Sequence, residues 1–233
     1  MSEQSLRARK KALTRAHVLA TAQRLFAERG FDAVPIADVA AAADVAVQTV
    51  FNHFATKEEL YWSGRAPWVT GPADAVRERP AGETPLGALR RHLVESMADF
   101  TQRLGEPEGR CAVAALDRSP ALRAAERELH HEAERLLAEA LEEALTEEPP
   151  AGLTTPPRLA ARLVAATWLS VTRSLVLTLR DPLPEPADVP ALVAQVRATT
   201  GRLLSRMQAD LEDAAAAGPG SAAGAVPGSL RAV

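Results

Sequence analysis

Apolar residues recur at helical spacing through most of the chain, and no segment shows the alternation typical of a half-buried strand. The first apolar stripe consists of Val18, Leu19, Ala22, Leu25 and Phe26. Gly30 follows it as a natural helix stop. Shorter stripes lie over residues 36–43 and 46–54, and a capping box of Thr56 and Glu59 then predicts a fourth helix. The pattern predicts an all-α protein that begins with short helices.

Beyond residue 65 the predicted helices are longer, and several begin at a proline. Three pairs, Thr84-Pro85, Ser119-Pro120 and Thr155-Pro156, place a capping hydroxyl before the first helical position. These pairs predict helices over about 84–104, 120–146 and 156–180. A last apolar stripe runs over 189–211 and ends in a Gly/Pro-rich tail, which we expect to be disordered.

The stretch DVAVQTVFNHFATKEEL, residues 44–60, combines an apolar face with a row of hydrogen-bonding side chains. Val45, Val50 and Phe54 are assigned to the core. A short helix over about 36–43, a turn and a second short helix form a helix-turn-helix, whose second helix can lie in the major groove of DNA. Such a helix must bury one face and present polar atoms on the other, and residues 46–54 meet this demand.

The ordered motifs resemble the DNA-binding domain of the TetR family of bacterial transcriptional regulators. The resemblance covers residues 14–60 and is carried by LATAQRLFAERGFDAVPIADVAAAADVAVQTVFNHFATKEEL. It implies a three-helix DNA-binding domain over 1–60 and a larger helical ligand-binding and dimerisation domain over 61–213, before a disordered tail over 214–233. It also implies a homodimer on a palindromic operator. Repression is favoured over activation, because occlusion of a promoter requires no polymerase-contacting surface.

The resemblance further implies a role for individual side chains in DNA binding. Phosphates would be contacted by Thr49, His53 and Lys57, and base edges would be read by Val47, Gln48, Phe51 and Asn52. Gln and Asn pair with adenine, whereas Val and Phe pack on a thymine methyl group. A basic N-terminal arm for phosphate or minor-groove contacts consists of Arg7, Arg9, Lys10, Lys11 and Arg15.

Four positions depart from the family pattern. Pro35 and Ala46 stand where a capping Ser or Thr is usual, and Phe51 replaces a tyrosine. Asp44 replaces the glycine of the turn, which Asp can do if its backbone is left-handed. We expect these changes to affect individual DNA contacts more than the fold.

Charge, cysteine content and hydropathy indicate in which cellular compartment the protein acts. The formal net charge of the 233 residues is −3 at pH 7, yet residues 6–15 carry five basic side chains and no acid. The single cysteine, Cys111, excludes an intramolecular disulfide and favours a reducing compartment. No apolar signal segment is seen, and Arg173 interrupts the most apolar stretch, 163–179. We therefore expect a cytoplasmic protein without a membrane span, in which 163–179 is a helix buried on two faces.

The helices over about 156–180 and 189–211 are apolar on more than one face, as expected if they pack both within the subunit and against its twin. The resemblance implies that they form an intersubunit four-helix bundle. Candidate residues for a pocket that binds an unknown small-molecule effector are Trp68, His92, Met97, Phe100, Trp168 and Arg173. Arg173 has two candidate partners, an anionic ligand and an internal carboxylate. The effector is expected to favour a form that releases DNA.

Catalytic chemistry has no visible motif in the sequence: there is no glycine-rich phosphate loop, no Gly-x-Ser-x-Gly and no paired-cysteine zinc pattern. His130, His131 and Glu134 are assigned to a solvated helix face and not to a metal site. We expect no cofactor, no metal and no enzymatic activity. The competing interpretation is a helical small-molecule-binding or sequestering protein with a degenerate DNA-binding head. An enzyme of unknown type comes third.

Overall fold

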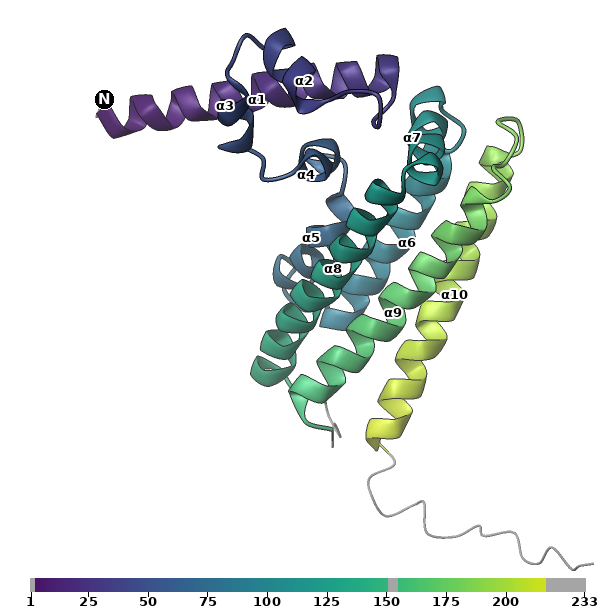
Figure 1. The fold of residues 1–233 in the computed structure, drawn as a ribbon. Coiled ribbons are helices and arrows are strands. Elements are labelled where there is room, and N and C mark those ends of the chain that lie inside the picture. Colours follow the sequence, from purple (N-terminus) through teal and green to yellow (C-terminus); the bar gives the residue numbers. More distant parts are fainter. Residues whose placement is uncertain (1–2, 151–154, 217–233) are drawn as a thin grey trace, which may run out of the picture. The chain divides into compact units, whose positions relative to one another are not determined.

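The computed structural model describes residues 3–150 and 155–216, and every regular element in those ranges is an α-helix (Figure 1). The helices are α1 Glu3–Arg29, α2 Ile36–Ala42, α3 Val47–Phe51, α4 Lys57–Trp62, α5 Pro67–Arg77, α6 Pro85–Arg103, α7 Pro107–Arg118, α8 Pro120–Glu147, α9 Pro157–Arg180 and α10 Val189–Ala216. The all-α prediction is confirmed. The sequence pattern predicts all of these helices except α5 and α7.

The helices form two compact units that interleave along the sequence. The first contains the N-terminal part as far as Val69 together with Arg103–Glu132, and the second contains Thr70–Gln102 together with the described residues from Ala133 onward. This division differs from the expected boundary at residue 60, because α7 and the first part of α8 join the N-terminal helices. Leu116 and Leu122 carry that connection, since both are buried in the core that α1 to α4 share.

One hydrophobic core holds the first unit together. Its buried residues from the N-terminal helices include Val18, Ala22, Leu25 and Phe26 of α1, Val39 and Ala40 of α2, Val50 and Phe54 at α3, and Leu60 and Tyr61 of α4. Phe26, Phe31 and Tyr61 stack pairwise, with ring centroids 5.3 to 6.0 Å apart. The apolar stripes read from the sequence therefore face one another, as amphipathic helices require.

The ends of the short helices follow the predicted turn chemistry. Gly30 ends α1 with a φ of 83°, a left-handed backbone that glycine adopts without steric cost. Asp44 is also left-handed, with a φ of 52°, in the turn between α2 and α3. At α4 the Thr56 hydroxyl accepts a hydrogen bond from the Glu59 N–H at 3.0 Å, and the Glu59 carboxylate accepts one from the Ala55 N–H at 2.7 Å.

Helix α1 is longer than its apolar stripe. It begins at Glu3 and contains the whole basic segment 6–15, which is therefore a helical extension and not an extended arm. No glycine or proline interrupts α1, and Ala, Leu, Arg, Lys and Glu make up most of it. These residues favour a helix even where no neighbouring element packs against it, so the helix continues into the exposed segment.

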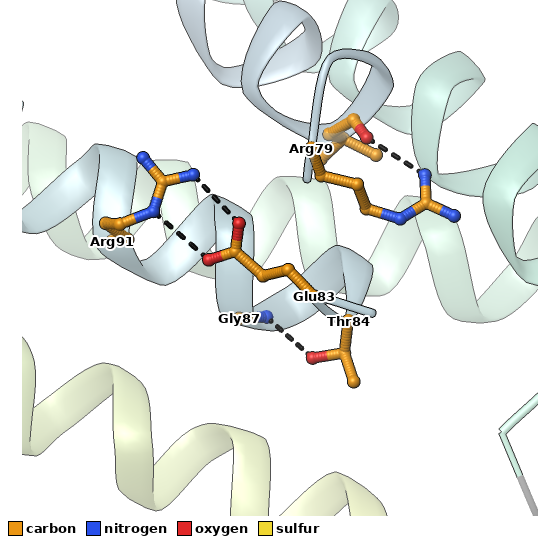
Figure 2. Close-up of polar contacts among 6 residues, drawn as sticks. Arg79, Glu83, Thr84, Gly87 and Arg91 are labelled. Carbon is orange, nitrogen blue, oxygen red and sulfur yellow. Dashed lines mark hydrogen bonds and ion pairs between the residues drawn. The ribbon is translucent and has the colours of Figure 1, made fainter. Parts of the chain in front are cut away.

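The second unit has a separate core built from α5, α6, α8, α9 and α10. Its buried residues include Ala73, Val76, Leu89, Leu93, Leu137, Leu141, Val164, Trp168 and Leu204. Figure 2 shows the start of α6, where the Thr84 hydroxyl accepts a hydrogen bond from the Gly87 N–H at 3.1 Å. Beside it Arg91 donates two hydrogen bonds to the Glu83 carboxylate, at 2.9 and 3.1 Å. The hydroxyl cap expected at Thr84 is therefore present.

Helix α9 is less buried than the sequence predicts. Leu159, Leu163 and Leu177 are 50%, 52% and 53% exposed, so the apolar helix is not buried on two faces within this chain. The helix is long and apolar enough to span a membrane by length and composition, and 28% of its apolar window is buried. One face packs into the core through Trp168, while the leucines lie on a face that no other part of the described chain covers.

The ends of α9 and α10 also differ slightly from expectation. Pro156 is the N-cap of α9 and Pro157 its first residue, so Thr155 does not cap it as its place before a proline predicts. Helix α10 continues to Ala216 and thus includes the first three residues of the expected disordered tail, 214–216. The rest of that tail, 217–233, lies outside the described residues.

Candidate DNA-binding interface

Helix α3 has one buried and one exposed side. Val50 and Phe54, four residues apart, are 0% and 1% exposed and lie in the core of the first unit. Val47 and Phe51, also four residues apart, are 41% and 43% exposed although both are large and apolar. Residues four apart share a helix face, so the helix presents an uncovered apolar row to solvent. This exposed row is the side of α3 that the sequence predicts to face DNA.

A row of two amide side chains lies beside the apolar row. Gln48 and Asn52 are exposed, and Gln48 Nε2 donates a hydrogen bond to Asn52 Oδ1 at 3.2 Å. This bond holds the two side chains together along the helix. The bond uses one N–H of Gln48 and one lone pair of Asn52 Oδ1, so both amides keep donors and acceptors for a further partner.

Thr49 of α3 and His53, in the turn directly after the helix, lie between its exposed and its buried sides. Both are half-buried, and the His53 ring lies 6.5 Å from that of Phe54. The His53 Nδ1 atom is buried and has no hydrogen-bond partner among the described residues. These two of the three residues predicted to bind phosphate therefore flank the exposed side of the helix and do not lie on it.

Lys57 lies on an aromatic surface. Its Nζ atom is 4.2 Å from the centre of the Phe31 ring and 5.9 Å from that of Phe26. Burial lowers the pKa of Lys57, while the charges of Asp32 and Glu58 act in the opposite direction. The two phenylalanines hold the ammonium group at the beginning of α4. The ammonium group of a lysine on an open surface would not be held in one place.

The basic residues of α1 divide into two groups. Arg15 is joined to the recognition region, because its guanidinium lies 4.5 Å from the centre of the Phe54 ring and donates a long hydrogen bond of 3.5 Å to the Ser63 hydroxyl. The other four, Arg7, Arg9, Lys10 and Lys11, are exposed on the helical extension. At 1.5 Å per residue, the extension places their charges roughly 6 to 12 Å along α1 from Arg15.

Two contacts that support this interface have no local sequence signal. Ser63 joins α1 to the end of α4, since its carbonyl accepts a hydrogen bond from Gln23 Nε2 at 3.1 Å. Ser119, at the start of α8, donates a hydrogen bond of 2.8 Å from its hydroxyl to Asp32 in the loop after α1. Both join residues far apart in sequence, so only the fold brings them together.

The region built around this interface matches a known family. Residues 18–62 match the model described as bacterial regulatory proteins, tetR family. Over these residues the chain is similar to the TetR family. The match covers α2, α3, α4 and the apolar part of α1, which are the elements that position the exposed rows of α3.

Individual proteins are also similar to this chain, one over a third of its length and others over most of it at low identity. It is 36% identical to the HTH-type transcriptional regulator TcmR of Streptomyces glaucescens over 84 residues, which are 36% of this chain and 37% of TcmR. NalD, the secondary repressor of the MexAB-OprM multidrug efflux pump in Pseudomonas aeruginosa, is 24% identical with a TM-score of 0.46, over 80% of this chain and 96% of that one. GusR of Salmonella enterica is 22% identical with a TM-score of 0.47, over 82% and 95%.

The departures from the TetR pattern have local structural consequences. Pro35 and Ala46 occupy the N-caps of α2 and α3, and neither makes a side-chain capping hydrogen bond. Asp44 has the left-handed backbone that its place in the turn requires. The three-helix arrangement is retained, which agrees with the expectation that these changes affect contacts more than fold.

The residues predicted to bind an effector do not gather at one described cavity. Trp68 belongs to the first unit, where its ring stacks on His130 with centroids 4.4 Å apart. Trp168 is fully buried in the second unit, and its Nε1 finds no hydrogen-bond partner in the described part of the chain. Phe100 is half-buried, with the Arg180 guanidinium 5.6 Å from its ring centre.

Met97, His92 and Arg173 complete that set. Met97 is buried on α6, and His92 on the same helix lies within 3.2 Å of the Ser96 hydroxyl. His92 packs so closely on Gly71 of α5 that a Cβ there would lie 2.8 Å from the ring. Burial lowers the pKa of His92, Arg91 adds to the shift and Asp74 opposes it. Arg173 is half-buried, and of its two candidate partners the internal carboxylate is not found among the residues that the structure describes.

A groove of about 320 Å³ lies between α9 and α10. Its walls are Ser170, Val171, Ser174, Leu175, Thr178 and Leu203. None of the six predicted effector-binding residues is among them. The groove lies on the side of α9 that carries the exposed apolar residues. It is therefore part of the predicted dimer surface and not an enclosed site for a ligand.

Proposed function

We propose that this protein is a sequence-specific, DNA-binding transcriptional regulator that acts in the cytoplasm, and that it represses by occupying its operator. The exposed side of α3 is the observation that carries the proposal. Val47, Gln48, Phe51 and Asn52 are all uncovered there, while Val50 and Phe54 anchor the helix from behind. This is the arrangement that a recognition helix needs in the major groove. The match of residues 18–62 to the tetR family supports it.

Phosphate contacts would come from two sides of that helix. Thr49, His53 and Lys57 flank α3 on one side, and the basic extension of α1 supplies Arg7, Arg9, Lys10, Lys11 and Arg15. Side chains of this kind fix the position of a protein on the duplex without reading its sequence. The extension lies close to the recognition helix through Arg15, which contacts the Phe54 ring.

A homodimer would bring two such heads to a palindromic operator. The exposed leucines of α9 and Leu203 of α10 form the surface proposed to pack against a second copy, as helices over 156–180 and 189–211 are expected to do. An apolar face of this size costs free energy in water and is covered in the proposed dimer. The same face accounts for the membrane-like composition of α9 without a membrane.

A small-molecule effector would act by binding more tightly to a form of the dimer in which the two heads no longer match the operator. The second unit holds five of the six residues proposed to bind it, with Trp68 the exception. The alternative of a sequestering protein with a degenerate head is less well supported, because the side chains that would read DNA are exposed and in register on α3.

The decisive experiment is selection of random duplex DNA by the purified protein at about 150 mM salt, followed by sequencing and titration of the selected duplex. We expect a palindrome bound far more tightly than a scrambled duplex of the same composition. Enrichment of no sequence, with binding that disappears as salt rises, would instead show that the basic extension attracts phosphate without sequence readout.

A further inference from the structure

The lysines of this chain are few and lie in one region. Of the 27 lysine and arginine residues, only Lys10, Lys11 and Lys57 are lysines, and every later one is an arginine. All three belong to the surface proposed to contact DNA. The difference is chemical, because a lysine amine can form an amide and lose its charge, while a guanidinium stays charged. A reagent that acylates amines therefore changes side-chain charge only within the proposed DNA surface.

Lys11 has an arginine on each side along its own face of α1. Residues four apart on a helix are neighbours, with Cβ atoms about 5 to 6 Å apart. This spacing places Arg7 one turn before Lys11 and Arg15 one turn after it, and all three side chains are exposed. Lys10 has such a neighbour on one side only, Arg7 three residues before it. Lys11 is therefore the lysine most closely surrounded by permanent positive charge.

The segment around Lys11 attracts anions. Residues 6–15 hold five basic side chains and no acid, so no carboxylate of the segment reduces its positive charge. Like charges one turn apart repel each other, and a bound polyanion relieves that repulsion. Because Lys11 is exposed, a dissolved molecule can reach its amine. An acyl donor that carries phosphate groups would be drawn to the two arginines, with its acyl group close to the amine between them.

We propose that Lys11 is an acylation site, that its donor is an acyl thioester of a phosphate-bearing carrier such as coenzyme A, and that acylation weakens DNA binding. After the ammonium group has given one proton to water, the neutral Nζ attacks the thioester carbonyl carbon. A C–N bond forms, the C–S bond breaks, and the carrier leaves as its thiol with the second proton of the amine. One positive charge becomes a neutral amide. The effect on DNA rests on the proposed function, in which Lys11 contacts phosphate.

Reaction of the full chain with acetyl-CoA at low salt tests the site, and fragmentation mass spectrometry follows each lysine. We expect Lys11 to be acetylated at least roughly threefold faster than Lys10, and Arg7→Gln or Arg15→Gln to slow Lys11 by a similar factor. Arg24→Gln is the matched control, because Arg24 is exposed on α1 roughly 20 Å beyond Lys11 and should change nothing. With N-acetoxysuccinimide, an uncharged acetyl donor, neither flanking arginine should affect the rate.

The effect on DNA is measured on Lys10→Arg/Lys57→Arg, which keeps every charge and has Lys11 as its single lysine. After acetylation this protein should bind the selected operator and random DNA more weakly by a similar factor, with the slope of log affinity against log salt reduced by about one. The lysine-free variant Lys10→Arg/Lys11→Arg/Lys57→Arg, treated in the same way, should bind as it does untreated. It also controls for reaction at the α-amino group. Circular dichroism checks that the acetylated proteins remain folded.

The outcomes separate the site from the function on which its effect rests. Equal acetylation rates at Lys10 and Lys11, or a Lys11 rate that is the same without Arg7 or Arg15, would overturn the site. Acetylation of Lys11 with no loss of DNA affinity in the single-lysine protein would overturn its effect on DNA binding. Selection of random DNA that enriches no sequence would overturn the proposed regulator, whereas the acetylation rates of Lys11 do not depend on that result.

Discussion

The turn of the helix-turn-helix depends on the backbone of Asp44. Its φ of 52° is one that glycine adopts freely, aspartate tolerates and alanine resists. We expect Asp44→Ala to lower the free energy of unfolding by about 1 kcal/mol, because alanine has a Cβ and no side-chain oxygen to compensate for it. Asp44→Gly should change it by less than roughly 0.5 kcal/mol. Urea denaturation of the three proteins compares them, and equal losses for the two variants would show that the turn is not left-handed in solution.

Lys57, which we propose to contact a phosphate of DNA, is held in place by a neighbouring aromatic ring. Its ammonium group is held 4.2 Å from the centre of the Phe31 ring. If it binds one phosphate, Lys57→Gln should weaken operator binding and non-specific binding about equally and reduce the slope of log affinity against log salt by about one. Titrations at several salt concentrations measure this. Arg206→Gln removes one charge from α10 and should leave the slope unchanged; a steeper loss on the operator than on random DNA would mean that Lys57 reads sequence.

At the scale of the elements, Ser119 at the start of α8 both caps that helix and links it to the loop after α1. The Ser119 hydroxyl accepts a hydrogen bond from the Leu122 N–H at 3.4 Å and donates one to Asp32 at 2.8 Å. Ser119→Ala removes both and should lower the free energy of unfolding by roughly 1 to 2 kcal/mol. Asp32→Asn keeps the cap, weakens the link to the loop after α1 and removes the carboxylate charge that acts on Lys57. Because water screens that charge, the loss should still be smaller than that of Ser119→Ala. Chemical denaturation distinguishes them, and equal losses would assign the whole effect to the link.

The sequence predicts helices best where one apolar stripe and clear end signals coincide. Helix α8 begins at Pro120 as the Ser119-Pro120 pair predicts, and the core positions Val50 and Phe54 follow from spacing alone. Helices α5 and α7 are missed for a local reason. Proline 72 lies inside α5, and α7 begins within the Gly- and Pro-containing stretch GEPEG, so residues that usually mark loops are built into helices.

Parts of the interface could not be foreseen because they depend on pairs distant in sequence. Helical periodicity predicts that Gln48 and Asn52 share one face of the helix. The structure adds the hydrogen bond between them. The contact of Lys57 with the Phe31 ring requires the start of α4 to pack beside the loop that follows α1. No local sequence pattern specifies this packing. The connection of Ser119 to Asp32 spans 87 residues and places α8 with the N-terminal helices.

The contact between α5 and α6 gives the second unit a dependence on pH. His92 packs on Gly71, burial lowers its pKa below the ordinary 6.5, Arg91 lowers it further and Asp74 opposes the shift. Because the unfolded chain binds the proton more readily, the contribution of His92 is complete above about pH 6.5 and is lost as the pH falls through 6.5 toward the lower folded value. We expect His92→Gln to flatten the decline of unfolding free energy on acidification.

Urea denaturation at about pH 7.5 and 5.5 measures that slope on both sides of the ordinary histidine pKa. His131→Gln is the matched control, because His131 is exposed on α8 and should leave the slope unchanged. An identical slope in His92→Gln and the unchanged protein would show that the packing of His92 on Gly71 does not govern the acid sensitivity of this unit.

At the scale of the whole molecule, operator recognition requires more than one copy of α3. A helix of five residues reaches few base edges, and each good contact is worth only roughly 1 to 3 kcal/mol of discrimination. Two heads held at a fixed spacing add their contacts and restrict binding to palindromes. In the proposed homodimer, the stability of the dimer would therefore set the affinity for DNA, although the two proposed surfaces lie in different parts of the chain.

Leu163 tests this dependence, because it is 52% exposed in the middle of the apolar face of α9. A carboxylate there would be buried without a partner on dimerisation, so Leu163→Glu should yield monomers in sedimentation experiments. We expect its affinity for the palindrome to fall by at least roughly tenfold, while its affinity for a single half-site matches that of the unchanged protein. Equal half-site binding shows that the head is still folded, so the loss on the palindrome reports the missing partner alone. A variant that remains dimeric and binds the palindrome normally would place the dimer surface elsewhere than on this face of α9.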